Sequence, residues 1–166
     1  VNALIILPAL NEEKVIKKVI KGLPKRIGNI PVEILLVDDG SKDDTAQIAS
    51  ALGVTVVRHV INRGLGAAIR TGLQWAKEKN IDIAITFDSD GQHNPNDLPR
   101  VIKPIINKKA DLVIGSRFKK KQNIPKDRLF LNWMANFLTF LIFGVFSSDS
   151  QSGLRAFSKK AINLLD

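Results

Sequence analysis

The sequence predicts a single α/β domain in which a mostly parallel sheet is flanked by helices, and two features of the chain predict it. Short apolar runs alternate with amphipathic segments along most of the chain. This alternation is typical of a parallel sheet, because parallel strands need crossover connections. Three of the apolar runs also stop at polar residues, and the carboxyl ends of parallel strands lie along one edge of a sheet. We therefore expect these polar residues to converge.

The expected elements follow one another without an internal repeat or a low-complexity linker. Strands are predicted at residues 3–7, 32–38, 54–60, 82–88 and 111–115, and helices at 12–23, 43–52 and 67–79. Residues 25–31 should form the return loop between the first helix and the second strand. Pro95, Pro99 and Pro104 punctuate the next helical stretch, which should therefore be broken or begin late.

Composition limits the class of protein. The 166 residues can bury roughly 70% of the surface that the unfolded chain exposes, so one domain over residues 1–166 is expected. The chain has no cysteine, which excludes a disulfide framework and a cysteine-ligated metal. The net charge of +9 favours anionic partners such as nucleotides, phospholipid surfaces or nucleic acid.

Asp88 and Asp90 follow an apolar run and are separated by one residue. In a continued strand both side chains would point to the same face. Two like charges in a small volume repel each other, and a nearby cation relieves the repulsion. The pattern therefore favours a divalent metal that carries a phosphorylated substrate. A polar turn is the alternative, because Asp-Gly sequences are common in turns.

Other strand ends carry polar residues as well. The first predicted strand leads into Asn11-Glu12-Glu13 and the second into Asp38-Asp39-Gly40-Ser41. The loop at 62–66 opens a helix and can either cradle an anion or pack that helix tightly on the sheet. Arg117 follows the last predicted strand and is either a solvated loop charge or a ligand for a diphosphate.

Residues 129–146 form a segment of 18 residues without charge. Asn132, Asn136 and Thr139 give it one polar stripe at helical spacing, and the rest is apolar. Basic residues at 119–121 precede it. These features predict an amphipathic helix that lies in an anionic bilayer interface without crossing it. The alternative is a buried core helix of a larger protein.

Taken together, six motifs resemble those of GT-A glycosyltransferases of family 2, in the same order. They are Pro8-x-x-Asn11-Glu12, Val37-Asp38-Asp39-Gly40-Ser41, Asn62-Arg63-Gly64-x-Gly66-Ala67, Asp88-Ser89-Asp90-Gly91-Gln92, Gly115-Ser116-Arg117 and Asp149-x-x-Ser152-Gly153-x-Arg155-Ala156-Phe157. The branch that they resemble is dolichol-phosphate mannose synthase and related polyprenyl-phosphate glycosyltransferases. The resemblance implies a GT-A fold over nearly the whole chain.

The resemblance also implies roles for individual residues. The base and ribose of a sugar nucleotide would be held by Pro8, Leu10, Glu12, Val37 and Asp39. Asp88 and Asp90 match the D-x-D motif that binds Mg²⁺ or Mn²⁺ and, through the metal, the diphosphate. Gln92 matches a further metal or substrate contact, and Arg117 a basic residue at the donor's phosphates or sugar. The acceptor side would include Asp149, Ser152 and Arg155.

The implied reaction is an inverting transfer of a hexose from a GDP-mannose or UDP-glucose type donor to a polyprenyl or dolichyl phosphate. Asp90, Arg117 and Asp149 are the candidate catalytic residues, although a lipid phosphate is largely dianionic at neutral pH and hardly needs a base. The enzyme would sit at the cytoplasmic face of a membrane, as a peripheral or monotopic protein. The family normally continues beyond this point, so the chain is expected to be incomplete at its C-terminus.

Two other classes of protein fit part of the sequence. Phe87-Asp88-x-Asp90-Gly91 also resembles the nucleophile motif of haloacid dehalogenase-type phosphatases, but the acidic pair that such enzymes need further along the chain is missing. A non-enzymatic nucleic-acid-binding domain would explain the positive charge. It would leave the carboxylates at the strand ends unexplained, so nucleic acid is not the expected partner.

Overall fold

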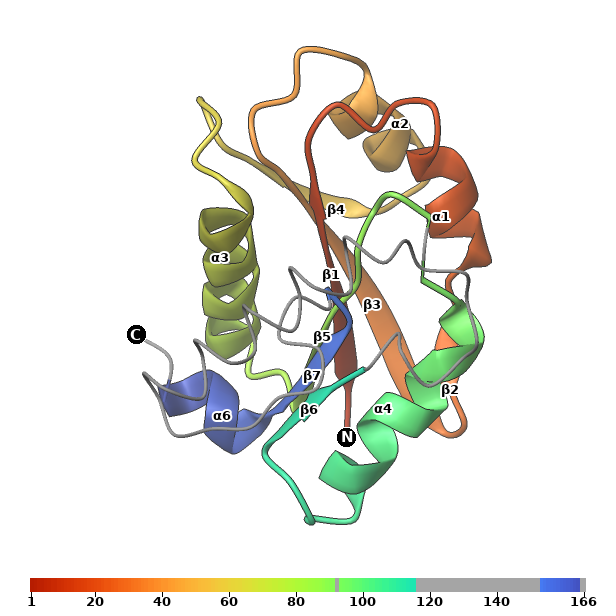
Figure 1. Ribbon diagram of the computed structural model, residues 1–166, viewed down its shortest axis with the longest axis vertical. Helices are drawn as coiled ribbons and strands as arrows, with labels where there is room; N and C mark the ends of the chain where they lie inside the picture. Colours follow the sequence, from red (N-terminus) through yellow and green to blue (C-terminus); the bar gives the residue numbers. More distant parts are fainter. Residues whose placement is uncertain (92, 116–152, 165–166) are drawn as a thin grey trace, which may run out of the picture.

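The computed structural model describes residues 1–91, 93–115 and 153–164, in which a twisted sheet lies between two layers of helices (Figure 1). The strands are β1 (Ala3–Ala9), β2 (Arg26–Ile27), β3 (Ile30–Asp38), β4 (Thr55–Arg58), β5 (Ile83–Thr86), β6 (Leu112–Ile114) and β7 (Arg155–Ser158). The helices are α1 (Ile16–Gly22), α2 (Thr45–Ala51), α3 (Leu65–Glu78), α4 (Leu98–Ile106) and α6 (Lys159–Leu164), with a 3₁₀ turn η1 (Pro95–Asp97) before α4.

The predicted mostly parallel sheet is confirmed. Its central path runs β3-β1-β5-β7-β6, and β4 pairs with β3. The pairs that β1 makes with β3 and β5, and that β3 makes with β4, are parallel. β7 is antiparallel to both β5 and β6. The carboxyl ends of β1, β3, β4 and β5 therefore share one edge.

Side chains on the two faces of the sheet enter two separate cores. One core joins the sheet to α1, α2 and α4, and the other joins it to α3 and α6. β1 is buried along its whole length, which explains why it is apolar at every position. Burying a Leu or Ile completely stabilises a fold by about 1.5–3 kcal/mol. The continuous apolar run of β1 therefore places it at the centre of the sheet.

Several boundaries differ from those predicted from the sequence. The first helix begins at Ile16 and not at residue 12, because residues 12–15 form a turn in which the carbonyl of Glu12 accepts from the N–H groups of Val15 and Ile16. The predicted return loop at 25–31 contains the short strand β2, which forms a hairpin with β3. The strand predicted at 82–88 ends at Thr86.

The proline-rich stretch behaves as predicted. The 3₁₀ turn at Pro95 precedes α4, which begins at Leu98 and contains Pro104. β7 and α6 were not predicted. The interface helix predicted at 129–146 lies outside the described residues, and no helix among those described is long and apolar enough to cross a membrane.

Candidate active site

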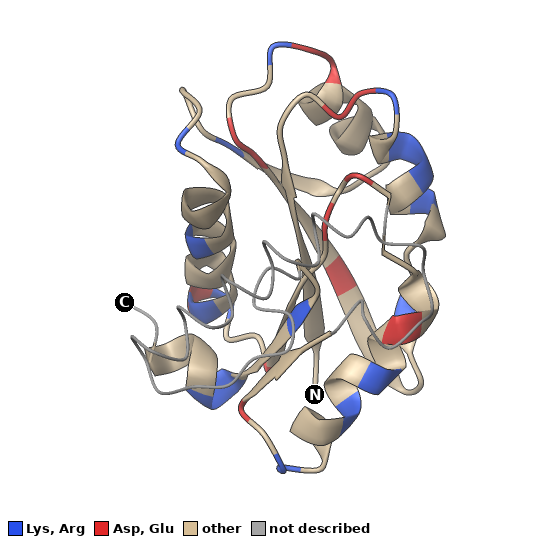
Figure 2. Ribbon diagram, viewed as in Figure 1, with Lys and Arg blue, Asp and Glu red and all other residues tan. Residues whose placement is uncertain are grey.

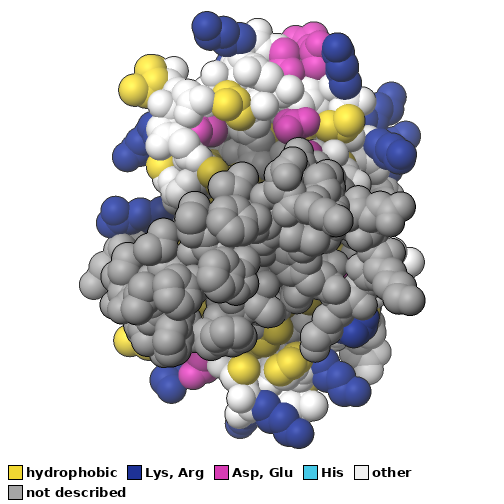
Figure 3. Space-filling view, in the orientation of Figure 1, with side chains coloured by type: hydrophobic (Ala, Val, Ile, Leu, Met, Phe, Trp, Pro, Cys, Tyr) yellow, Lys and Arg dark blue, Asp and Glu magenta, His cyan; other side chains and the backbone are white. Residues whose placement is uncertain are grey.

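The polar strand ends converge on one cavity of about 380 Å³. It is open to solvent and within the size range of small-molecule sites. Described residues that line it are Pro8, Ala9, Leu10, Glu12, Asp39, Asn62, Gly64, Leu65, Ala68, Asp88, Ser89 and Asp90. In Figure 3 acidic side chains lie near the centre of the upper part of the face shown, and Lys and Arg lie mainly around its rim.

The turn after β3 holds two buried carboxylates with different tasks. Asp38 is fully buried and accepts a hydrogen bond of 3.0 Å from the N–H of Ser41. Its other oxygen lies 2.9 Å from Nε of Arg58, whose guanidinium also donates to the Ser41 carbonyl at 2.6 Å. Gly40 has φ +80°, and a Cβ there would lie 2.8 Å from the backbone of Asn62. Asp38 therefore shapes the turn, and Asp39 is the residue that reaches the cavity.

Asp39 is only 4% exposed, yet it is surrounded by donors. Oδ1 accepts from the N–H of Arg63 at 2.9 Å and lies 2.7 Å from Nδ1 of His59. Oδ2 accepts from the N–H of Gly64 at 2.7 Å. Burial raises the pKa of the Asp39 carboxyl, but these donors outweigh burial and hold it below its ordinary value. Asp39 is therefore ionised and fixed in place at neutral pH.

The anionic ligand that one of the two sequence interpretations predicts for the loop at 62–66 stays a prediction, and in the structure the loop binds an anionic group of the protein itself. The anion is the side chain of Asp39, which takes the N–H groups of Arg63 and Gly64. Gly64 has φ +89°, a conformation that favours glycine and lets its N–H turn toward the carboxylate. The loop thereby becomes a wall of the cavity that is tied to the end of β3.

Glu12 faces the cavity from the turn after β1. Its own N–H donates to Oγ1 of Thr45 at 2.8 Å, which joins the turn after β1 to the first residue of α2. Burial raises the pKa of the Glu12 carboxyl, and the negative charges of Asp90 and Asp43 raise it further. The site therefore concentrates negative potential between Glu12 and Asp90, which favours a bound cation.

The segment after β5 places two carboxylates in the cavity by means of a buried serine between them. Ser89 is 5% exposed and donates to the carbonyl of Pro8 at 2.8 Å. Asp88 and Asp90 flank it and both line the cavity, although the strand itself has already ended at Thr86. Their shared side, expected from strand geometry, thus comes from a turn anchored on β1.

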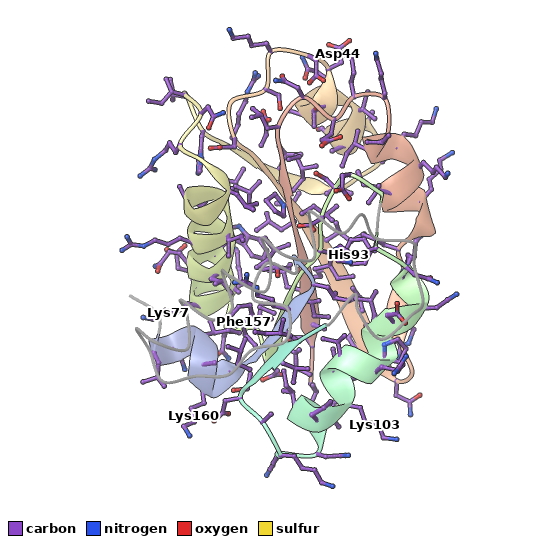
Figure 4. The ribbon with its side chains drawn as sticks, viewed as in Figure 1. Asp44, Lys77, His93, Lys103, Phe157 and Lys160 are labelled. Carbon is purple, nitrogen blue, oxygen red and sulfur yellow. The ribbon has the colours of Figure 1, made fainter. Side chains whose placement is uncertain are left out.

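Asp88 is held by contacts on both sides. Oδ2 lies 2.8 Å from Nε2 of His93, whose ring packs against Phe87 with a centroid separation of 5.6 Å. Figure 4 shows His93 on the loop between β5 and α4. On the other side, a Cβ at Gly153 would overlap the Asp88 carboxylate. The carbonyl of Gly153 accepts from Oγ1 of Thr86 at 2.7 Å.

The residues present fit a divalent metal that a substrate helps to hold. Within the described ranges no three His, Cys, Asp or Glu side chains are grouped so that they could hold a metal by themselves. Asp88 and Asp90 nevertheless offer carboxylate oxygens on one cavity. Mg²⁺ typically binds one or two carboxylates together with substrate phosphates. The donor set suits such a shared ion.

The structure brings together most of the described residues that were predicted for the site. Those that line the cavity are Pro8, Leu10, Glu12, Asp39, Asp88 and Asp90. Val37 does not, because it is fully buried in the core on the α3 side of the sheet. Arg155 lies on β7 opposite Thr86. Gln92, Arg117, Asp149 and Ser152 lie outside the described residues.

Sequence reasoning missed His59 and His93, which contact two of the cavity carboxylates, Asp39 and Asp88 respectively. Two histidines seemed too few for a His-rich site, and neither lies in a spacing typical of metal ligands. The only local signal was position, since His59 directly follows a strand and His93 follows the Asp-x-Asp-Gly turn.

Comparisons with known proteins find relatives of this chain among glycosyltransferases. The chain is 42% identical over 181 residues to a UDP-N-acetylglucosamine–dolichyl-phosphate N-acetylglucosaminyltransferase of Methanococcus voltae, covering 97% of this chain and 71% of the relative. It is 32% identical over 179 residues to a polyprenol monophosphomannose synthase of Mycolicibacterium smegmatis, covering 99% of this chain and 64% of the relative.

A solved structure shares the fold. Glucosyl-3-phosphoglycerate synthase of Mycobacterium tuberculosis, in complex with Mn²⁺, UDP-glucose and phosphoglyceric acid, superposes with a TM-score of 0.73 and 26% identity. The superposition covers 96% of this chain and 57% of that protein. The chain thus spans between 57% and 71% of the length of these three proteins.

The family model for glycosyl transferase family 2 matches residues 4–165, almost the whole chain. Its extent confirms the resemblance indicated by the six motifs. The chain belongs to glycosyl transferase family 2.

Proposed function

We propose that the chain is the catalytic domain of a metal-dependent glycosyltransferase that moves a sugar from a nucleoside diphosphate to a polyprenyl phosphate. The observation that carries this proposal is the single cavity in which Asp39, Asp88 and Asp90 meet. Two relatives named above act, by their names, on dolichyl or polyprenyl carriers. Family membership favours this function over the phosphatase and the nucleic-acid-binding domain.

The donor would lie across the cavity from the end of β3 to the end of β5. Asp39, Pro8 and Leu10 line the side suited to a base and ribose. Asp88 and Asp90 line the side suited to the diphosphate and its metal. We infer that Mg²⁺ or Mn²⁺ is held there, in keeping with the Mn²⁺ in the structural neighbour. When bound, the metal would stabilise the departing nucleoside diphosphate as a Lewis acid.

The protein's own residues would bind and orient. The carboxylates at Asp88 and Asp90 position the donor through the shared ion, and Ser89 keeps their turn attached to β1. Arg117 and Asp149 remain proposed contacts for the donor phosphates and the acceptor. The phosphate oxygen of a lipid monophosphate is already negatively charged when it attacks the anomeric carbon, so an additional strong base is unnecessary. We also propose that the acceptor is met at a membrane surface.

The donor sugar is the finest part of the proposal. The relatives named above include an N-acetylglucosamine and a mannose transferase, so UDP-N-acetylglucosamine, UDP-glucose and GDP-mannose are the donors to compare. Calorimetric titration of the full chain with each donor, with Mn²⁺ or with a chelator, tests the proposal. We expect one donor to bind in a metal-dependent manner. Absence of metal-dependent binding to all three would contradict it.

Asp90→Asn is the matching variant. Asp90 is exposed on a turn and contributes little to the core, so the fold should survive. We expect the metal-dependent affinity for the donor to fall at least tenfold, which is about 1.4 kcal/mol. Asp44→Asn is the control, since Asp44 is also an exposed loop carboxylate but does not line the cavity. Equal affinity of the wild type and Asp90→Asn would refute the metal assignment.

A further inference from the structure

We propose that His59 is a positioning residue for the nucleotide side of the cavity, where it fixes the Asp39 carboxylate and the loop wall attached to it. The inference rests on the proposed function for its substrate class. The contacts between His59, Asp39 and the loop are given by the structure and do not depend on that function.

His59 is buried behind the cavity and does not line it. Its exposed fraction is 7%, and it follows β4 directly. Nδ1 lies 2.7 Å from Oδ1 of Asp39, and Nε2 lies 2.9 Å from Oγ1 of Thr71 on α3. Both ring nitrogens therefore have partners, and the ring bridges the end of β3 and helix α3.

The chemistry of the partners fixes the direction of the first hydrogen bond. An ionised carboxylate only accepts, so Nδ1 of His59 carries the proton and donates to Asp39. Nε2 can accept from the Thr71 hydroxyl or, in the imidazolium form, donate to it. In either case the ring is held at both ends. A hydrogen-bond donor behind a carboxylate fixes its orientation, in the same way that groups hydrogen-bonded to a metal ligand fix the orientation of that ligand.

The Asp39 carboxylate passes this constraint on to the cavity wall. The oxygen that faces His59 also accepts from the N–H of Arg63, and the second oxygen accepts from the N–H of Gly64. Asn62, Gly64 and Leu65 then line the cavity. Of the Asp39 donors in the described part of the chain, His59 supplies the side-chain one. Without it only the two N–H groups would hold the carboxylate, and the wall would be anchored less firmly.

The competing explanation is that His59 only cements α3 to the sheet. Two substitutions separate the explanations. His59→Asn places an amide N–H near the position of Nδ1 and so retains a donor for Asp39, but it loses Thr71. His59→Gln places its amide near the position of Nε2 and so retains Thr71, but it leaves Asp39 without the side-chain donor.

The experiment measures three quantities on the full chain: the melting temperature, donor-nucleotide affinity by calorimetry, and hydrogen exchange of the Arg63 and Gly64 amides. Both variants should lose similar thermal stability, since each loses one buried hydrogen bond. We expect His59→Gln to bind the donor nucleotide at least tenfold more weakly and to exchange both amides at least tenfold faster. His59→Asn should remain within about threefold of the wild type in both.

The outcomes distinguish the two proposals. If both variants lose affinity and amide protection in proportion to the fall in their melting temperatures, His59 only joins α3 to the sheet and the inference is wrong. If His59→Gln accelerates exchange selectively while the wild type binds no nucleotide sugar, the positioning of the loop stands and the proposed function fails. Unchanged exchange in His59→Gln would overturn the inference whatever the nucleotide affinity.

Discussion

Asp88 is confined by two residues that come from different parts of the chain. His93 contacts its Oδ2 from the loop that follows β5. Gly153 lies against the same carboxylate from the segment that leads into β7. The position of Asp88, the proposed metal ligand, therefore depends on the absence of a side chain 65 residues away from it, at Gly153.

Replacing Gly153 by Ala should displace the Asp88 carboxylate and leave the fold in place. The added Cβ would overlap the end of a side chain, which can rotate, and not a backbone atom. We expect metal-dependent donor affinity, measured by calorimetry, to fall at least tenfold. The melting temperature should fall by no more than about 4 °C, which corresponds to roughly 1 kcal/mol for a domain of this size.

Gly22→Ala is the matched control for this substitution. The nearest atom to a Cβ at Gly22 lies 3.9 Å away, an ordinary contact, and Gly22 does not line the cavity. Its donor affinity should equal that of the wild type. Unchanged metal-dependent binding in Gly153→Ala would show that the position of Asp88 does not matter for the metal.

At this scale the sequence predicts the carboxylates but not their partners. Asp39, Asp88 and Asp90 were predicted because each follows an apolar strand, and strand ends converge in a parallel sheet. His59 lies 20 residues from Asp39, and Gly64 lies 25 residues from it. Contacts at such separations depend on how β3, β4 and α3 pack, which no local pattern encodes.

At the scale of elements, α3 packs against β1 through a glycine. Gly72 is buried in the middle of the helix, and a Cβ there would overlap the side chain of Ile6. The close approach brings the helix down onto the central strand. The N-terminal end of the same helix forms part of the cavity wall, so the contact between Gly72 and Ile6 also determines how close that part of the wall lies to the sheet.

Gly72→Ala is therefore expected to destabilise the fold. Ala is favoured over Gly in a helix by about 1 kcal/mol, but overpacking typically costs about 1–3 kcal/mol. Overpacking should prevail at this site, because Ile6 is fully buried and has nowhere to move. Urea denaturation should show a net loss of up to about 2 kcal/mol.

Gly66→Ala, in the same helix, is the comparison. No atom lies within 4 Å of a Cβ at Gly66, so only the gain in helix propensity should remain, up to about 1 kcal/mol. A stabilised Gly72→Ala variant would mean that α3 does not press on β1 as the structure shows.

Elements with a continuous pattern were predictable, and elements defined by their partners were not. β1, β3 and α3 were predicted within a few residues, because apolar strands and an amphipathic helix leave clear periodicity. β2 has two residues and exists only because β3 pairs with it. β7 lies antiparallel between β5 and β6, a position that follows from the return of the chain and not from its own composition.

At the scale of the whole molecule, charge is divided between two regions. Figure 2 shows Lys and Arg on the helices α1, α3, α4 and α6, whereas Asp and Glu gather mainly on the loops at the carboxyl ends of the strands. The net charge of +9 predicted anionic partners. It could not indicate that the candidate site itself would be acidic, because the sum over the chain conceals its distribution.

The acidic edge contains carboxylates whose pKa values move in opposite directions. The pKa of Asp39 and that of Asp43 lie below their ordinary value of 3.8. At Asp43, burial raises the pKa, but the hydroxyl and N–H of Thr45 and the N–H of Glu13 outweigh it. The pKa of Glu12 lies above its ordinary value of 4.5, because of burial and then of Asp90 and Asp43.

These opposite shifts predict a stability maximum in mildly acidic solution. A raised pKa at Glu12 contributes stability that is fully present below 4.5 and is lost as the pH rises through the folded-state pKa. Lowered pKa values at Asp39 and Asp43 contribute stability that is present above 3.8 and is lost as the pH falls through the folded-state values.

Without divalent metal, the free energy of unfolding in urea should therefore rise slightly as the pH falls toward 4.5, and then decrease below 3.8. Glu12→Gln should abolish the rise in the free energy of unfolding and keep the decrease below pH 3.8. Asp43→Asn should keep the rise and remove part of the decrease. A Glu12→Gln profile that matches the wild type would mean that Glu12 does not face the charges of Asp90 and Asp43.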